Sequence, residues 1–441
     1  MNKYPKYKSS GVEWIGEIPE HWYLSKFKYT TDIYNGDSLN DQQKIDFESD
    51  DLEEIPYVSS KDIDVNYLTI NYNNGLRIPK TNTKLKRGFK GGFLLCIEGG
   101  SSGKKMVFLE EDVCFVNKLC YFKSYNQNSK FLFYFIRGYN FQSQFYLSMT
   151  GLIGGVSVST IKNFELPLPP HTEQQQIVQF LDEKTEVIDK LISTKERKIE
   201  LLKQQRTSLI NEVITKGLNP KVKMKDSGVE WIGEIPEHWK ISKLKFDTST
   251  PVQYGLNISG DKYKEEGIRF IRITDLTEEG ELILDDGKYL DEKEVPKEFL
   301  LNKYDVLFCR SGHTVGKSYL HLQEGKYTSG GYLVRFNFRN YSESKFIFYL
   351  GKTSFYWDWI KLNSVVSTIE NVNGDKYQNF QYPKPPIQEQ QQIINHLDNL
   401  TKEIDDLVSM EQKKIDLLKE YRQSLISEVI TGKIDVRNYY N

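Results

Sequence analysis

Two glycine loops carry the residues of this sequence whose types and spacing could do chemistry. Gly312–Ser318 reads G-H-T-V-G-K-S, which is one residue short of a phosphate-binding P-loop. The related loop Gly99–Lys105 ends in Gly-Lys-Lys and lacks the Ser or Thr that would bind magnesium. A loop that brings Lys104, Lys105 or Lys317 to nucleic-acid phosphates is therefore favoured over nucleotide binding. A plain surface turn is the remaining interpretation and is favoured over both.

Arg272, Arg310 and His313 have side chains that could contact the base edges of nucleic acid. Arginine is the commonest reader of guanine, because its guanidinium forms two parallel hydrogen bonds to O6 and N7. His313 flanks the second glycine loop and is the weaker candidate. For each arginine, an exposed position on a strand or a local ion pair is the alternative interpretation.

A basic stretch in the first half of the chain suits contact with phosphates, which attract lysine and arginine whatever the base sequence. Its members are Lys61, Lys84, Lys86, Arg87 and Lys90. A run of charge is as often a solvated face, so both interpretations remain open at this stage.

No residues are arranged for catalysis. Paired carboxylates, a nucleophile elbow and an H-E-x-x-H motif are all missing. An adenine methyltransferase would need an [ND]-P-P-[YF] tetrad to hold a flipped base, whereas the two Pro-Pro pairs here precede His171 and Ile387. His171 matches Ile387 in the repeat described below, and His396 matches Phe180, which argues against a duplicated metal site. The sequence therefore predicts a chain that is not itself an enzyme.

The charge balance limits where nucleic acid could bind. The formal net charge is −2, from 59 Lys and Arg against 61 Asp and Glu, so the chain is not basic all over. Any nucleic-acid surface must come from local segregation of basic residues, and the acidic residues must lie on other faces or meet a protein partner. With 38% hydrophobic and 13% aromatic residues, the 441 residues can form packed cores in two or three domains.

The expected compartment is the cytoplasm. No run reaches the roughly 18–20 apolar residues of a membrane helix, and residues 1–10 lack the apolar run of a signal peptide. Four cysteines are too few for a disulfide framework and lack zinc-ribbon spacing. We expect reduced, mostly buried thiols at Cys96, Cys114, Cys120 and Cys309.

The chain is a duplicate of itself. The thirteen residues SGVEWIGEIPEHW occur at Ser10–Trp22 and again at Ser227–Trp239. A longer segment that begins at Leu166 returns in related form at Tyr382. We expect the apolar residues of the short repeat to be core anchors, with contact to a partner protein as the alternative: Trp14, Ile15, Ile18, Trp22, Trp231, Ile232, Ile235 and Trp239.

Between the repeats lie the first variable region, Tyr23–Glu165, and the second variable region, Lys240–Gln381, of 143 and 142 residues. Their sequences differ widely, but the segment from Gly92 echoes the segment from Asp305 at an offset of 213. The echoes place Arg272 and Arg310 where the first region has Ser59 and Ile97. The pattern indicates one fold with two divergent surfaces.

Each variable region should be mixed α/β. Short β-branched and aromatic runs such as GFLLCI and DVLFC alternate with glycine turns, as is typical of strands. FLFYFIRGYNFQSQFY and KFIFYLGKTSFYWDWI each predict one aromatic-rich helix near the end of the region.

The longer repeats predict two helices with a coiled-coil seam. Prolines precede each helix, and Gly217 and Gly432 supply the stops. Between them apolar residues recur with a heptad spacing. The seam positions that we expect to hold the helices together and to dock partners include Ile177, Leu181, Ile188, Lys195, Leu202, Leu209, Ile393, Leu397, Ile404, Glu411, Leu418 and Leu425.

This order of segments resembles the specificity (S) subunits of type I restriction–modification enzymes. The resemblance rests on the paired IPEHW segments, on the P-x-P-P openings followed by E-Q-Q-Q-I at Leu166–Ile177 and Tyr382–Ile393, and on the two variable regions. It covers essentially the whole chain. It implies that each variable region is a target recognition domain, and that the helices form an antiparallel spacer and docking surface.

The resemblance also implies the partners. They would be double-stranded DNA with a bipartite, asymmetric target, two methyltransferase (M) subunits, and restriction (R) subunits held through the complex. This chain would carry no cofactor, and S-adenosylmethionine, ATP and magnesium would bind to partner subunits. A specificity module of another restriction–methylase assembly would look the same. A nucleotide hydrolase and a DNA-free coiled-coil scaffold are the alternatives from other classes.

The expected architecture is therefore an α/β chain of two homologous target recognition domains, related by a pseudo-two-fold duplication and joined by two long antiparallel coiled-coil helices. The expected segments are residues 1–165, 166–220, 221–381 and 382–441. A pseudo-two-fold axis near the middle of the first helix would bring Lys195 close to Glu411, with Cβ atoms within about 11 Å. Opposite charges there would set the helix register.

Overall fold

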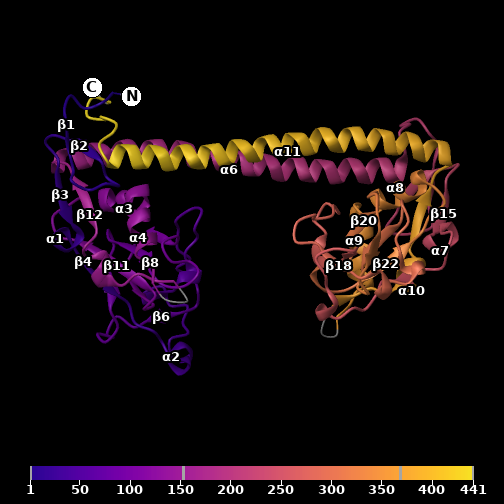
Figure 1. The fold of residues 1–441 in the computed structure, drawn as a ribbon, viewed down its shortest axis with the longest axis horizontal. Coiled ribbons are helices and arrows are strands. Elements are labelled where there is room, and N and C mark those ends of the chain that lie inside the picture. The colour runs from indigo at the N-terminus through magenta and orange to yellow at the C-terminus, as the bar shows by residue number, and fades with distance from the viewer. Residues whose placement is uncertain (1, 151–153, 367–369, 440–441) are drawn as a thin grey trace. The chain divides into compact units, whose positions relative to one another are not determined.

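The computed structural model describes residues 2–150, 154–366 and 370–439. The chain forms two compact units (Figure 1). Unit 1 comprises residues 1–195 with 413–441, and unit 2 comprises residues 196–412. Each unit therefore contains one variable region and half of each long helix, so the units cut across the four segments expected from the sequence.

Unit 1 contains two four-stranded sheets, both within the first variable region. In one, the strand order is β4 (Thr31–Asn35), β11 (Leu119–Ser124), β8 (Phe93–Cys96) and β9 (Met106–Phe108), all antiparallel. In the other, it is β6 (Arg77–Ile78), β5 (Ile55–Val58), β10 (Val113–Phe115) and β7 (Arg87–Gly88). The β5–β10 pair is parallel.

Unit 2 repeats this strand order, with three strands instead of four in its second sheet. Its first sheet has the order β16 (Gln253–Tyr254), β22 (Leu333–Phe336), β19 (Val306–Cys309) and β20 (Ser318–Leu320). Its second has the order β18 (Lys288–Leu290), β17 (Ile268–Ile271) and β21 (Tyr327–Ser329), with β17 and β21 parallel. The mixed α/β class and the internal duplication are thus confirmed.

The repeated segments close each variable region at its ends. Strand β3 (Tyr23–Lys26) pairs with β12 (Glu165–Leu168), and β15 (Lys240–Lys243) pairs with β25 (Gln381–Lys384). Each short repeat supplies the turn and second strand of a hairpin whose first strand precedes it, β1 (Tyr7–Ser9) with β2 (Glu17–Pro19) and β13 (Met224–Asp226) with β14 (Glu234–Pro236). The remaining short strands and α-helices of the described residues are the pair β23 (Val365–Val366) and β24 (Glu370–Asn371) and the helices α1 (Phe27–Thr30), α2 (Asp41–Asp46), α5 (Val158–Ile161), α7 (Leu244–Asp247) and α10 (Gly374–Gln378).

The aromatic-rich segment near the end of each variable region forms two helices, so the expectation of one helix each was wrong. They are α3 (Ser129–Arg137) with α4 (Tyr139–Leu147), and α8 (Tyr341–Leu350) with α9 (Ser354–Asn363). Gly138 breaks the first pair because its backbone is extended, and a Cβ there would lie 2.2 Å from Cδ1 of Ile430. The close approach of a neighbouring helix thus needs glycine at the break.

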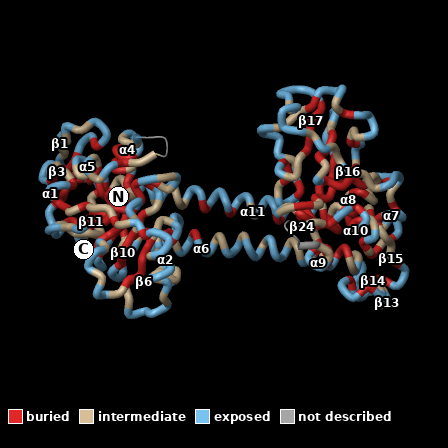
Figure 2. Tube along the Cα trace, turned by 90° about the horizontal axis from the view of Figure 1, so that it is seen from below, coloured by how far each residue is buried: buried red, intermediate tan, exposed pale blue. Residues whose placement is uncertain are grey.

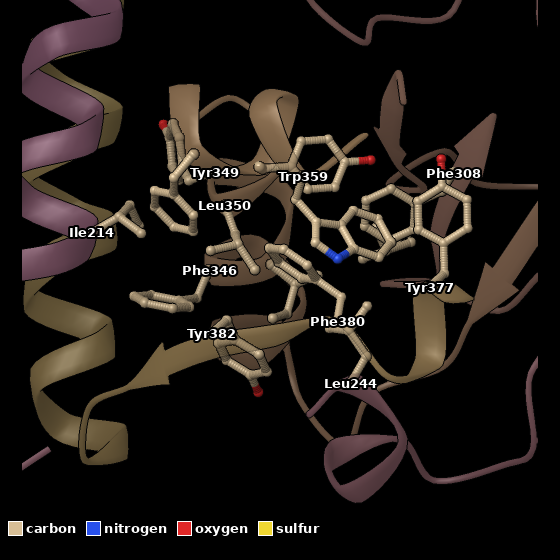
Figure 3. Packing of buried hydrophobic residues seen from close by; sticks show 14 of the residues in the cluster. Ile214, Leu244, Phe308, Phe346, Tyr349, Leu350, Trp359, Tyr377, Phe380 and Tyr382 are labelled. Carbon is tan, nitrogen blue, oxygen red and sulfur yellow. The ribbon is translucent and has the colours of Figure 1, made fainter. Parts of the chain in front are cut away.

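The core of unit 2 lies between the first sheet, helices α8 and α9, and the long helices. Figure 3 shows its aromatic centre, where Trp359 and Phe380 lie with ring centroids 4.7 Å apart and Phe308 stacks on Tyr377 at 5.1 Å. Ile214 reaches the same cluster from a long helix. Burial of this large apolar surface is the main force that holds the variable region to the helices.

The long helices are α6 (His171–Lys216) and α11 (Ile387–Ile430). Each is followed by a glycine with positive φ, Gly217 at 71° and Gly432 at 73°. Only glycine adopts this left-handed conformation without strain, and it ends an α-helix by satisfying a carbonyl of the last turn. The predicted stops are confirmed.

Within each unit the two helices run antiparallel. In unit 2, Glu411 contacts Lys198 and Asp405 contacts Arg206. Residue numbers thus fall along α11 as they rise along α6, so the helices are antiparallel. In unit 1, Asp189 of α6 forms an ion pair with Arg422 of α11. The predicted seam positions that are buried are Ile177, Leu181, Ile188, Ile393, Leu397, Ile404, Glu411 and Leu425, while Lys195, Leu202, Leu209 and Leu418 are partly exposed.

Glu411 is a buried charged residue of the seam, and only 3% of it is exposed. Its carboxylate lies 2.9 Å from the ammonium of Lys198, a partner that follows Lys195 by almost one helical turn. The proximity of Lys195 to Glu411 stays a prediction.

The four cysteines are buried and free, as expected. No helix in the described ranges combines the length and apolar character needed to cross a membrane. Buried residues gather in the strands and aromatic helices, whereas the connecting loops are exposed (Figure 2). The loops are therefore the surfaces on which the two variable regions could differ in function.

Candidate nucleic-acid interface

The two variable regions share a backbone frame at the end of their central strands. Leu119 pairs with Cys96 in the first region, and Leu333 pairs with Cys309 in the second. The next residues, Ile97 and Arg310, therefore occupy the same position. This confirms the alignment inferred from the sequence echo.

Backbone hydrogen bonds on both sides of this position are also duplicated. Val156 N donates to Ile97 O at 3.0 Å, and Val372 N donates to Arg310 O at 2.9 Å. On the other side, Ile97 N donates to the carbonyl of Lys118 and Arg310 N donates to that of Tyr332. The same frame thus presents isoleucine in one region and arginine in the other.

Arg310 is held above an aromatic ring. Its Cζ lies 4.9 Å from the ring centroid of Tyr254, a cation–π contact. The Tyr254 hydroxyl accepts from Gly374 N at 2.8 Å, which fixes the ring. Among the described residues no carboxylate or carbonyl accepts from the Arg310 guanidinium, and its Nε is buried without a hydrogen-bond partner. The Tyr254 ring therefore orients the guanidinium, and no ion pair among the described residues neutralises it.

Sequence reasoning missed Tyr254. Its counterpart is Asn35, because Asn35 lies opposite Cys120 as Tyr254 lies opposite Val334. The glycine that follows each residue could have revealed the match, since a Cβ at Gly36 would lie 1.8 Å from Phe115 O and one at Gly255 would lie 2.2 Å from Ser329 O. Two neighbouring positions thus change together between the regions, from Ile97 with Asn35 to Arg310 with Tyr254.

In the first variable region the same position borders a hollow of about 650 Å³. Ile97 is buried in its wall, and Asn35, Glu98 and Ser157 also line it. Lys86 reaches this edge, since its ammonium donates to Asn35 O at 3.0 Å. A hollow with amide, carboxylate and hydroxyl groups could accept a base edge that differs from the one an arginine reads.

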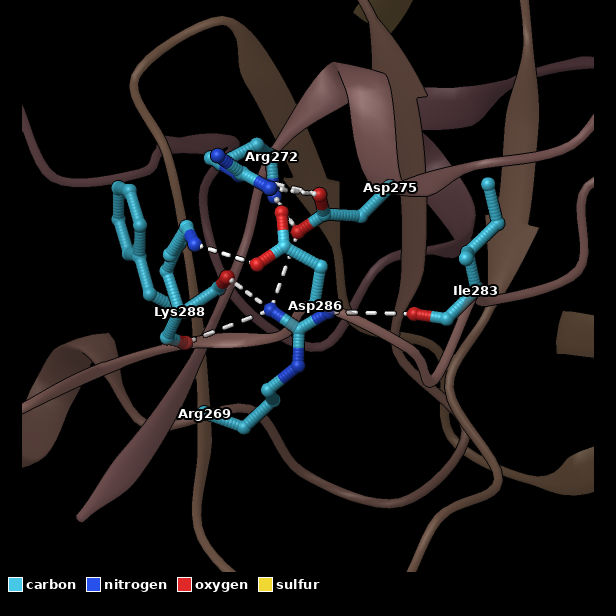
Figure 4. A network of polar contacts seen from close by, with 7 residues as sticks. Arg269, Arg272, Asp275, Ile283, Asp286 and Lys288 are labelled. Carbon is cyan, nitrogen blue, oxygen red and sulfur yellow. Dashed lines mark hydrogen bonds and ion pairs between the residues drawn. The ribbon is translucent and has the colours of Figure 1, made fainter. Parts of the chain in front are cut away.

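The second candidate arginine, Arg272, is held in an ion pair. Its Nη2 and Nε donate to Asp275 at 2.6 and 3.0 Å, and Arg269 donates to the same carboxylate at 3.0 Å (Figure 4). The pairing raises the pKa of Arg272 above its usual value. Arg272 is partly exposed and could present its remaining donors, but Asp275 fixes its orientation.

The basic residues of the first variable region form two groups. Lys61 and Lys105 line one hollow, where the Lys105 ammonium donates to Ser60 O at 2.7 Å, and Lys104 is exposed beside them. In the other group Lys84, Lys86 and Lys90 are exposed, while Arg87 donates to the carbonyls of Lys80 and Asn82. Lys61, Lys84, Lys90 and Lys104 are exposed, whereas the ammonium groups of Lys86 and Lys105 already donate to backbone carbonyls. Arg87 supports the backbone of its own loop.

The glycine loop of the second variable region has the wrong context for a P-loop. Val306 pairs with Leu320 and Phe308 with Ser318, so the loop joins two antiparallel strands, whereas a P-loop opens a helix. Lys317 is buried, and its ammonium lies 2.6 Å from Glu278. His313 is exposed at the tip. The topology excludes the P-loop interpretation.

The core anchors of the short repeat divide into two sets. The side chains that are buried, as expected, are Ile15, Ile18, Trp22, Ile232, Ile235 and Trp239. Trp14 and Trp231 are exposed, so the expectation was wrong for this pair. Each lies in the turn between the two strands of its hairpin.

The two variable regions thus share one backbone frame, carry different side chains on it, and are each joined to the long helices. A family model described as "Type I restriction modification DNA specificity domain" matches the chain twice, over residues 30–202 and 237–419. The chain therefore belongs to the family of type I restriction–modification DNA specificity subunits. Subunits of this kind are the non-catalytic part of their enzyme.

Individual relatives agree with this assignment. The type I restriction enzyme MjaVIII specificity subunit of Methanocaldococcus jannaschii is 26% identical over 296 residues, which are 64% of this chain and 65% of that protein, just under two thirds of its length. The MjaIX specificity subunit of the same organism is 22% identical over 96% of this chain and 95% of its own. A chain solved in work on complex assembly of the type I R-M system shares the fold, with a TM-score of 0.71 and 16% identity over 95% of this chain and 99% of its own.

Proposed function

We propose that this chain reads a bipartite, asymmetric DNA target, one half with each variable region. The observation that carries the proposal is the shared frame that presents Ile97 beside a hollow in one region and Arg310 on a tyrosine ring in the other. Two readers of the same fold with different contact chemistry would recognise different half-sites. The helices would fix the distance between them, near one turn of B-DNA, about 34–36 Å.

Arg310 is the proposed reader of guanine in the second half-site. Lys61, Lys104 and Lys105, together with Lys84 and Lys86, would hold phosphates in the first. Arg272 and His313 are second-rank contacts, because one is tied to Asp275 and the other has no supporting ring. Lys317 would have to leave Glu278 before it could reach DNA.

The long helices are the proposed docking surface for two methyltransferase subunits, which would in turn hold restriction subunits. The buried seam residues hold α6 and α11 together and cannot touch a partner. The outward faces carry four leucines at matching repeat positions, which sequence reasoning missed: Leu191, Leu201, Leu407 and Leu417. Exposed leucines in both copies suit an interface that is covered in the complex.

The chemistry would belong to the partner chains. S-adenosylmethionine, ATP and magnesium would bind there, and this chain would supply DNA contacts and position. The described residues hold no cluster of His, Cys, Asp and Glu suited to a metal ion. The complex would work in the cytoplasm, where its cysteines stay reduced.

The test is a domain exchange. Residues 23–165 are replaced by the variable region of another specificity subunit, the chain is co-expressed with its methyltransferase, and modified adenines are mapped in the DNA. One half-site should change while the other half and the spacing persist. The reciprocal exchange of residues 240–381 is the matched control and should change the opposite half. If either exchange altered both halves, the proposal of two independent readers would be wrong.

A further inference from the structure

The two copies of the short repeat are identical at their exposed residues as well as at their buried ones. Residues 10–22 and 227–239 are identical, although the variable regions that follow have diverged. Burial explains why isoleucine and the second tryptophan are kept. It does not explain Trp14 and Trp231, which are 45% and 37% exposed, because substitution at such positions costs a fold little.

The backbone of the repeat builds the same rigid tip twice. In unit 1, Ser10 N donates to Gly16 O and Gly16 N donates to Val12 O, both at 2.9 Å. In unit 2, the matching bonds are 3.0 and 3.2 Å, from Ser227 N to Gly233 O and from Gly233 N to Val229 O. A turn closed by these bonds holds its outward side chains in a fixed direction before any partner arrives, which lowers the entropy cost of binding.

Two carboxylates flank each exposed tryptophan. Residues 10–17 and 227–234 contain two glutamates and no lysine or arginine. Glu13 and Glu17, like Glu230 and Glu234, are exposed and enter no ion pair among the described residues. Each tip is therefore an aromatic anchor between two free negative charges.

This chemistry fits a protein and opposes DNA. Phosphates would be repelled by the glutamates, and duplex DNA offers no pocket for an indole at its surface. Protein interfaces, by contrast, take tryptophan as a central anchor and place charges at the rim. Two identical tips would serve two copies of the same partner.

We propose that the two hairpin tips, Ser10–Glu17 and Ser227–Glu234, each dock one methyltransferase subunit, which would offer an apolar slot for the tryptophan and a basic rim for the glutamates. This rests on the proposed function, since it names a second contact for the same partner away from the long helices. Because the tips belong to different units, each would engage its own copy.

The test uses the full chain with the methyltransferase subunit of its own system, and counts bound copies by sedimentation velocity. The Trp14→Ala and Trp231→Ala chains should each weaken one of two binding steps at least about tenfold, and the double variant should weaken both. Tyr23→Ala is the matched control, because Tyr23 is an exposed aromatic residue whose repeat counterpart is Lys240. It should bind two copies as the wild type does.

A second pair of variants tests the charge. Glu13→Lys with Glu17→Lys should weaken one binding step, whereas Glu110→Lys with Glu111→Lys, which reverses two exposed charges outside the repeat, should not. Loss of binding with an unchanged unfolding midpoint of the free chain supports the docking tips. Unchanged affinity in the double tryptophan variant and in the tip charge variant overturns them.

Mapping of modified adenines separates this inference from the function on which it rests. With the tip variants, the methylated sequence should stay the same while the extent of methylation falls. A wild-type chain that binds no methyltransferase would refute both proposals. A wild-type chain that binds two copies, beside tip variants that bind equally well, would refute the docking tips alone.

Discussion

The two variable regions fill the same corner of their first sheet with opposite chemistry. In the first region, Gly92 precedes β8 and lies against Tyr121, so close that a Cβ would be 2.3 Å from the ring. Leu109 closes the corner, and it is fully buried. The first region therefore solves this corner with apolar and aromatic packing.

The second region has charge at the matching positions. Strand register places Asp305 where the first region has Gly92, and Arg335 where it has Tyr121. Asp305 is fully buried, with Arg335 Nε 2.6 Å from its carboxylate, and Asn337 donates to it at 2.6 Å. Burial raises the pKa of Asp305 above its usual value, although Arg335 and Asn337 act in the opposite direction.

The two regions therefore share their strand pairing but not the side chains at this corner. Those side chains can be exchanged only together. A glycine with a tyrosine works, and an aspartate with an arginine works. One member of either set beside one of the other would leave an empty space or an unpaired charge. Four predictions follow from contrasts between matching positions, beginning with the corner itself.

The largest effect is expected from breaking the buried ion pair. Arg335→Met leaves the Asp305 carboxylate without its cation and should cost about 3–5 kcal/mol of stability in unit 2. Hydrogen exchange of the β19 and β22 amides reports this locally. The control is Tyr121→Phe in unit 1, which removes only a hydrogen bond to Phe89 O and should cost about 1 kcal/mol. Equal losses in the two units would contradict the contrast.

The same corner predicts a pH dependence in unit 2. His321 stands where the first region has Leu109, and burial, assisted by the charge of Arg335, lowers the pKa of His321 from 6.5 to about 4. The unfolded chain therefore binds more protons between pH 6.5 and about 4. Stability from this residue is full above pH 6.5 and is lost as the pH falls through that window, by up to about 3 kcal/mol.

The measurement is the free energy of unfolding of unit 2 at pH 7 and at pH 4.5. His321→Leu copies the residue of the first region and should flatten the pH dependence over this window. The exposed His313, changed to Leu, is the matched control and should leave it intact. A wild-type slope that persists in His321→Leu would show that another group titrates.

The third contrast lies at the reading position. Arg310→Ala should cost about 1–3 kcal/mol of DNA binding at one base pair of the second half-site and leave the first half-site unchanged. Tyr254→Ala should give a smaller loss, because the guanidinium keeps its donors but loses the ring that orients it. Competition with single-base variants of the target measures both. A loss shared equally by all sequences would indicate a phosphate contact.

Much of the fold could be predicted because the sequence contains internal repeats and apolar residues at heptad spacing. The identical short repeats and the heptads predicted two equivalent units, the antiparallel helices and the glycine stops. The break at Gly138 could not be predicted, since a helical segment tolerates one glycine. The side chain that requires glycine at this position belongs to Ile430, a residue almost three hundred positions away.

The candidate site was predicted less completely. Arg310 was found because an arginine replaces Ile97 within a recognisable echo. Tyr254 was missed, since strand β16 is two residues long and no echo surrounds it. Lys317 looked available in a glycine loop, and its burial against Glu278 depends on a contact from a distant part of the chain. A sequence pattern can identify a basic residue, but tertiary contacts decide whether its side chain is available to bind a partner.

The smallest effect is expected in the helix seam, where two lysines could partner Glu411. The carboxylate is buried and pairs with Lys198, which stands beside the seam and keeps its stem half in solvent. Lys195 occupies the seam position itself. A lysine at the flank can reach the carboxylate and remain hydrated, so the Lys198 pair should be the stronger.

Double-mutant cycles separate the two pairs. The coupling free energy between Glu411→Gln and Lys198→Met should be about 1 kcal/mol, near the upper end for a partly exposed ion pair. The coupling of Glu411→Gln with Lys195→Met should be no more than about half of that. The total is small because one partner stays in water, but it bears on register: a slip by one heptad would place the buried carboxylate against apolar side chains. A larger coupling to Lys195 would support the pairing that the repeat symmetry predicts and contradict this ranking of the two lysines.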